Sequence, residues 1–187
     1  MVQIKYKGLD KNIKTAIDNM NTLFGYSGFY DSIKRHLKFD MANVPPSWIA
    51  DLIKSSNIEM SVDFYYSVNP FSNALCYDDP KDATVIHLNK WNLHKSTGSL
   101  CNAMMHQCVH AVNAQYPQYS FGHGNDLTEG INNTAPYWIA NLAQQIIMKD
   151  DSIAESLCHE LIVNIPEVNA YYIEQRITNS KGRIAYN

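Results

Sequence analysis

Residues 102–114 read NAMMHQCVHAVNA, and this stretch places His106 and His110 four positions apart with Gln107 between them. On an α-helix, side chains four apart lie one turn above one another on the same face. Two imidazoles in that arrangement can reach one metal ion, and zinc, copper and nickel accept the neutral nitrogen of histidine. Apolar residues repeat at helical spacing elsewhere on the same helix and predict its buried stripe: Leu100, Met104, Cys108 and Val112.

The hydrophobic pattern around this helix predicts an α+β fold. Alternating apolar residues indicate strands, and apolar residues three and four apart indicate amphipathic helices. We expect a small sheet, then the long histidine-bearing helix, then a mostly helical C-terminal half, all in a single domain over residues 1–187. The expected helices cover 13–24, 45–53, 96–114, 134–149, 151–163 and 166–178, and the expected strands cover 61–68, 74–77 and 83–91.

Composition excludes several classes of protein. The 187 residues are 45% hydrophobic and 18% charged, which is typical of a globular chain. A net charge of −3 with scattered basic residues argues against a nucleic-acid partner. No apolar run approaches the length of a membrane span, and the N-terminal stretch lacks the apolar segment of a signal peptide. The four cysteines form no C-x-x-C pair and are expected to be buried free thiols.

Histidine pairs four apart also occur by chance on ordinary helices, so the pair alone does not establish a metal site. Three further features favour one. The pair lies on the polar side of the helix, a strand precedes it, and a glycine-rich loop with His123 follows it.

The stretch HQCVH resembles the HExxH signature of the zincins, a class of zinc metallopeptidases, with Gln107 where the family has glutamate. The strand TVIHLNKW followed by the histidine helix is similar to the family's edge strand and active-site helix, over about residues 60–130. The resemblance implies that His106 and His110 hold Zn²⁺. It also implies that residues 84–90 align a substrate backbone, with His87 and Asn89 as substrate-binding residues.

Gln107 is the departure from the family pattern. A glutamate there would accept a proton from the metal-activated water, whereas a neutral amide of nearly the same size cannot. We therefore expect fold and metal to be preserved and catalysis to be silenced at this catalytic position. An engineered inactivation is favoured over a natural pseudoenzyme, because the rest of the motif is intact.

A zincin needs a third protein ligand, and the sequence offers two main candidates. Glu167, in NIPEVNAYYIEQ, resembles the E-x-x-A element of the gluzincins, whose third ligand is glutamate. His123, in FGHGND, is the alternative ligand, and its flanking glycines would let the loop approach a metal. Glu167 ranks first, which leaves His123 as a catalytic residue that donates a hydrogen bond to the oxyanion.

A looser resemblance connects YSFGHGND and NTAPYWIANLA with metallopeptidase toxin domains that bacteria attach to secretion-system spikes. It implies an effector that a secretion system delivers without a signal peptide, to the periplasm of a target cell or into a host cell. The substrate would be a peptide, a protein or a peptidoglycan peptide, and a cognate immunity protein would be the partner. The alternative function is a non-catalytic protein that keeps the zincin fold to bind a peptide or a partner.

Overall fold

The structure is a computed structural model that describes residues 1–69, 71–72, 74–77, 79, 81–122 and 133–149. These residues all belong to one compact unit, Met1–Ile153. The predicted helices over 151–163 and 166–178 lie outside the described residues, as do His123 and Glu167. The described elements are β1 (Gln3–Lys5), α1 (Lys11–Gly25), α2 (Ser27–Arg35), α3 (Pro46–Ser55), β2 (Glu59–Tyr65), β3 (Cys76–Tyr77), β4 (Val85–Asn89), the short 3-10 helix η1 (Lys90–Asn92), α4 (Thr97–Gln115) and α5 (Ala135–Lys149).

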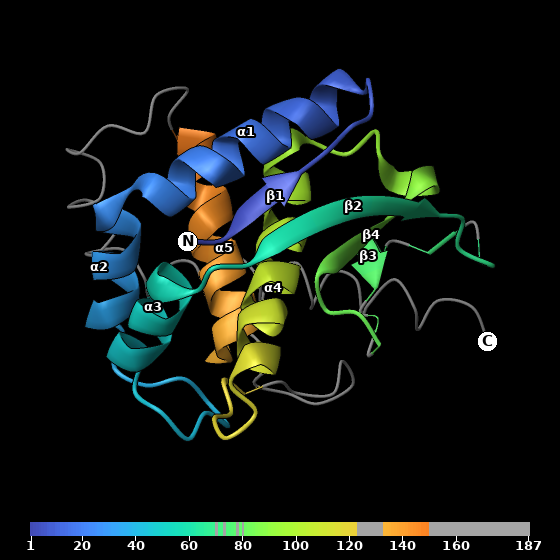
Figure 1. Cartoon of the computed structure of the whole chain (residues 1–187). Helices are drawn as coiled ribbons and strands as arrows, with labels where there is room; N and C mark the ends of the chain where they lie inside the picture. The colour runs from blue at the N-terminus through green and yellow to red at the C-terminus, as the bar shows by residue number, and fades with distance from the viewer. Residues whose placement is uncertain (70, 73, 78, 80, 123–132, 150–187) are drawn as a thin grey trace, which may run out of the picture. The chain divides into compact units, whose positions relative to one another are not determined.

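This part of the chain forms a small α+β domain with a mixed sheet in the order β1-β2-β4-β3 (Figure 1). β1, β2 and β4 run parallel, and β3 pairs antiparallel with β4 at the edge. One face of the sheet is apolar and packs into the core, because alternate residues of a strand point to the same side. Its buried residues are Ile4, Met60, Ile86 and Leu88.

The sequence places the edge of this sheet wrongly. Residues 84–90 were expected to form the edge strand, but β4 lies between β2 and β3, so the edge strand on that side is β3. The strand of residues 83–91 reads as a good isolated β-pattern, whereas Cys76–Tyr77 is too short for periodicity to reveal a pairing partner. Three elements were not anticipated: the three-residue strand β1, the helix α2 and the short 3-10 helix η1.

α1 packs against α4 and is joined to it by hydrogen bonds. Its N-terminus is capped by Asp10, whose carboxylate accepts a hydrogen bond from the backbone N–H of Ile13 at 3.0 Å. Further along, the Cys101 thiol on α4 donates to the carbonyl oxygen of Ala16 at 3.4 Å. The Thr97 hydroxyl donates to the Asn12 side chain at 2.7 Å, which fixes the start of α4 against α1.

The long helix α4 agrees with its prediction in extent, cap and buried stripe. Ser96 caps it by accepting from the N–H of Ser99 at 3.2 Å. The four residues of the expected stripe, Leu100, Met104, Cys108 and Val112, are all buried. In Figure 1, β2 passes in front of α4 and the orange α5 runs beside it. Among the helices described, none is both long and apolar enough to cross a membrane.

Candidate metal site

The polar side of α4 is narrow. Between residues 100 and 113 only four positions are half-buried, and all the others are buried. They repeat at helical spacing along one line: Asn102, His106, His110 and Asn113. The two motif histidines therefore lie on the half-buried stripe of this part of α4.

The rings of His106 and His110 converge. Their Nε2 atoms are 2.9 Å apart, and the ring centroids are 4.6 Å apart at an interplanar angle of 62°. Two histidine nitrogens that share a tetrahedral zinc ion, each about 2.0–2.1 Å from the metal, lie about 3.3 Å apart. The same nitrogen of each ring thus points to the same place, at nearly the spacing that a shared metal requires. Without a metal, 2.9 Å also fits one N–H···N hydrogen bond between two neutral rings.

Gln107 lies on a different side of α4, beneath the edge strand. Its side chain is buried, with the residue 7% exposed, and its Nε2 donates to the Cys76 sulfur at 3.4 Å. The Cys76 thiol in turn donates to the carbonyl oxygen of Ala103 at 3.6 Å. Residue 107 is therefore held by β3 as well as by its own helix. From the sequence, Cys76 was predicted to be a buried free thiol like the other three cysteines. The pairing of β3 with β4 explains why this thiol faces α4.

His87 and Asn89, the expected substrate-binding residues, make contacts with neighbouring strands and turns of the sheet. Asn89 is fully buried, accepts from Trp91 N at 3.2 Å and donates to Ala74 O at 3.1 Å. His87 pairs across the sheet with Tyr77, on the face opposite to Cys76 and α4. That register separates His87 from His106 and His110 by the thickness of the sheet.

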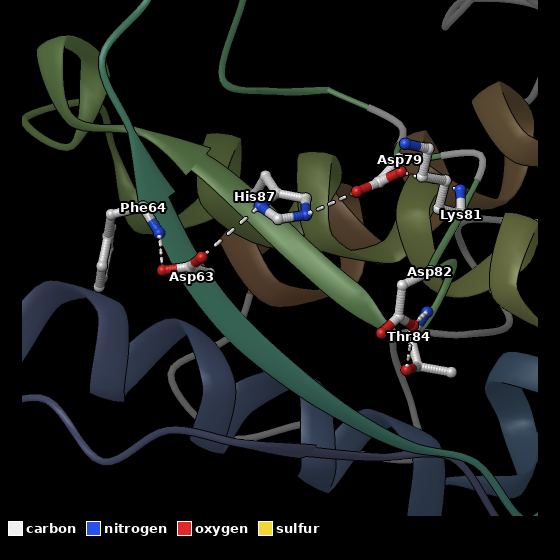
Figure 2. Close-up of polar contacts among 7 residues, drawn as sticks. All are labelled: Asp63, Phe64, Asp79, Lys81, Asp82, Thr84 and His87. Atoms are coloured by element: carbon white, nitrogen blue, oxygen red, sulfur yellow. Dashed lines mark hydrogen bonds and ion pairs between the residues drawn. The ribbon is translucent and has the colours of Figure 1, made fainter.

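Two carboxylates flank the His87 ring, as Figure 2 shows. Its Nδ1 lies 3.9 Å from Asp63 and its Nε2 lies 3.7 Å from Asp79, and Tyr77 stacks on the ring with centroids 4.6 Å apart. Within the described residues the Nε2 atom is buried without a hydrogen bond. Because the two nitrogens face opposite ways, the three side chains do not converge on one point as metal ligands would.

The loop between α2 and α3 is hydrogen-bonded to described residues before and after residues 123–132. At the start, Asn43 N donates to Ser120 O at 3.0 Å, and the Asn113 side chain of α4 accepts from Phe121 N at 3.0 Å. At the end, Asp40 N donates to Asn133 O at 3.0 Å. The described segment that ends at Gly122 is therefore bonded to α4 one turn beyond His110.

Within the part of the chain that the structure describes, no group of three or more His, Cys, Asp or Glu side chains could hold a metal ion. The candidate metal ligands within the described residues are His106 and His110. Both candidates for a third ligand lie outside the described residues. Comparison of the chain with protein-family models, with curated proteins and with solved structures finds no match.

Proposed function

We propose that this protein is a zinc metallopeptidase domain whose general-base position is occupied by Gln107. The observation that carries the proposal is the convergence of the His106 and His110 Nε2 atoms to 2.9 Å on the half-buried stripe of α4. Imidazole nitrogen suits zinc, and two ligands one helical turn apart are the pattern of a helical zinc motif. The bound ion would polarise a substrate carbonyl and lower the pKa of water.

The chain's own residues divide the remaining work. His106 and His110 would hold the ion through Nε2. Residue 107 would have to accept a proton from the water and donate it to the leaving amine. Glutamate can perform that transfer, whereas glutamine cannot. The present sequence is therefore proposed to bind metal and substrate without turning substrate over.

For the third ligand the proposal keeps Glu167 first, because NIPEVNAYYIEQ resembles the E-x-x-A element of the gluzincins, and both candidates lie outside the described residues. His123 is the alternative ligand. If Glu167 binds the metal, His123 is proposed to donate to the oxyanion instead.

The proposed substrate is a peptide bond in a peptide, a protein or a peptidoglycan peptide, and the proposed setting is a bacterial effector delivered by a secretion system. A cognate immunity protein would then be its partner. These assignments rest on the loose resemblance of residues 119–126 and 133–143 to bacterial metallopeptidase toxin domains.

A specific observation favours the second candidate function, a non-catalytic protein that binds a peptide or a partner. The buried Gln107 amide donates a hydrogen bond to the Cys76 sulfur, and a carboxylate has no N–H to make that bond. Glutamine at position 107 therefore makes a hydrogen bond that glutamate could not make. The two functions differ in what a glutamate at this position would do.

The deciding experiment is to compare Gln107→Glu with the unchanged chain against a peptide library and peptidoglycan fragments. General-base assistance is typically worth about 10²–10⁴-fold in rate, so the variant should cleave at least about a hundred times faster. Cleavage should stop when a chelator removes the metal, and it should be absent from Gln107→Glu carrying His106→Ala. A variant that binds zinc yet cleaves nothing beyond the unchanged chain would favour the binding protein.

A further inference from the structure

α4 and α5 are packed antiparallel in a fixed register along the line of half-buried positions. The Asn102 side chain on α4 donates to the Asn141 side chain on α5 at 2.8 Å. One turn further along α4 is His106, and one turn back along α5 is Tyr137; their ring centroids are 4.4 Å apart. The amide pair therefore sets which α5 residue faces the first motif histidine.

Contact at the other end of the two helices agrees with this register. A Cβ built at Gly98 would lie 2.6 Å from Met148 Cγ, so α5 crosses the start of α4 closely. Gly98 precedes Asn102 by one turn, and Met148 follows Asn141 by about two turns. The same antiparallel alignment thus extends from Gly98 to His106.

Tyr137 meets His106 with its ring tilted by 69°, in an edge-to-face arrangement. Aromatic rings at such distances prefer this geometry, because the positive edge of one ring faces the negative face of the other. His106 also contacts His110 through its Nε2, so its ring is fixed from two directions. An imidazole that is free to rotate about χ2 would lose part of the alignment that metal binding needs.

We propose that Tyr137 is a positioning residue for His106, and that the Asn102–Asn141 amide pair sets the register that brings it there. This inference rests on the proposed function for its metal, but its geometric claim concerns only the described side chains. The ring of Tyr137 is the part that acts, so phenylalanine should replace it and an aliphatic side chain should not.

The experiment compares Tyr137→Phe and Tyr137→Leu in the full chain. The first readout is the NOE signals between the His106 and His110 rings in metal-free protein, because these report ring orientation whereas chemical shifts change with the loss of the Tyr137 ring current alone. The second is the zinc Kd measured against a chromophoric chelator. Residues that orient a ligand are typically worth about 10–100-fold in metal affinity. We expect Tyr137→Leu to weaken the His106–His110 NOE signals and to weaken zinc binding about tenfold, and Tyr137→Phe to keep the NOE signals and stay within about twofold in zinc Kd.

Tyr6→Leu is the matched control, because Tyr6 also packs edge-on against an aromatic ring, that of Phe64, with centroids 6.0 Å apart. It should leave the His106–His110 NOE signals and the zinc Kd unchanged. If Tyr137→Leu does not fold, Tyr137→Met fills more of the volume without a ring and takes its place.

Two outcomes would overturn the positioning role. One is that the aliphatic variant leaves both the His106–His110 NOE signals and the zinc Kd unchanged. The other is that Tyr137→Phe loses as much affinity as Tyr137→Leu, which would assign the effect to the hydroxyl. If the unchanged chain takes up no zinc, the proposed function fails separately, and the metal-free NMR signals still decide whether Tyr137 orients His106.

Discussion

Gln107 shows how burial changes the expected effect of a single substitution. From the sequence, exchanging its amide for a carboxylate was expected to leave the fold nearly untouched. In the structure the side chain is buried, and its amide donates to the Cys76 sulfur, a hydrogen bond that a carboxylate cannot make. Gln107→Glu should therefore destabilise the metal-free protein, because burial disfavours the charged form and raises the pKa of such a carboxyl.

The sign of the pH dependence follows from that raised pKa. The unfolded chain loses its proton near pH 4.3, below the folded protein, so the variant's free energy of unfolding should fall as pH rises above about 4.3. Denaturant unfolding at pH 4 and pH 8 measures this change. Gln118→Glu, at an exposed position, is the matched control and should show no such loss. Equal behaviour of the two variants would mean that residue 107 is solvated.

His36 is a second group whose protonation should make stability depend on pH, and here the charged form is a cation. Its ring stacks on Phe39 and lies against Trp138, with centroid distances of 4.5 and 4.4 Å, and its Nε2 bonds to the Asn133 side chain at 2.9 Å. Desolvation by burial lowers the pKa of His36, and this outweighs the opposing effects of the Asn133 and Lys38 hydrogen bonds and of the Asp40 charge.

Because the folded pKa of His36 is depressed, the unfolded chain takes up the proton first as pH falls. The free energy of unfolding should therefore decrease from about pH 6.5 down to the folded pKa. His36→Phe retains a ring in the stack and cannot titrate, so its stability should depend less on pH over this window. The exposed His94→Gln is the control and should follow the unchanged chain. Thermal unfolding at pH 7, 6 and 5 makes the comparison, and parallel curves for all three proteins would rule out this role.

At the scale of the elements, the close contact between the α2–α3 loop and residues 120–122, called the joint below, requires a glycine at position 122. Gly122 has a φ of +74°, and a Cβ there would lie 2.1 Å from the carbonyl oxygen of Asp40. Ala42 and Phe121 form an isolated antiparallel bridge beside it. The left-handed backbone alone costs a residue with a Cβ about 1–2 kcal/mol, and the clash with backbone adds to that. Gly122→Ala should therefore lose at least about 2 kcal/mol of unfolding free energy.

Gly25→Ala is the matched control for this prediction. Gly25 ends α1, and a Cβ there would meet nothing within 4 Å. Its effect should stay within about 0.5 kcal/mol in denaturant unfolding. If the two alanine variants unfold alike, the joint at Gly122 does not form as described.

At the scale of the whole molecule, the sequence predicted local features well and pairings poorly. The boundaries of α4 and α5 followed from caps and apolar spacing, since Ser96 and the Ala135–Pro136 start are local signals. The position of β4 inside the sheet did not follow, because the partner of β3 depends on contacts distant in sequence. For the same reason the spacing of His106 and His110 indicated a shared site, whereas the contacts of Cys76 and Tyr137 with that region came only from the fold.

The central claim is that His106 and His110 together hold a metal ion. Its most direct test is zinc content after equilibration with excess zinc and removal of the unbound metal. We predict one zinc per chain in the unchanged protein, loss in His106→Ala and in His110→Ala, and full retention in His94→Ala, which changes an exposed histidine outside α4. Less than about a tenth of an equivalent in the unchanged chain, or equal retention in all three variants, would contradict the account.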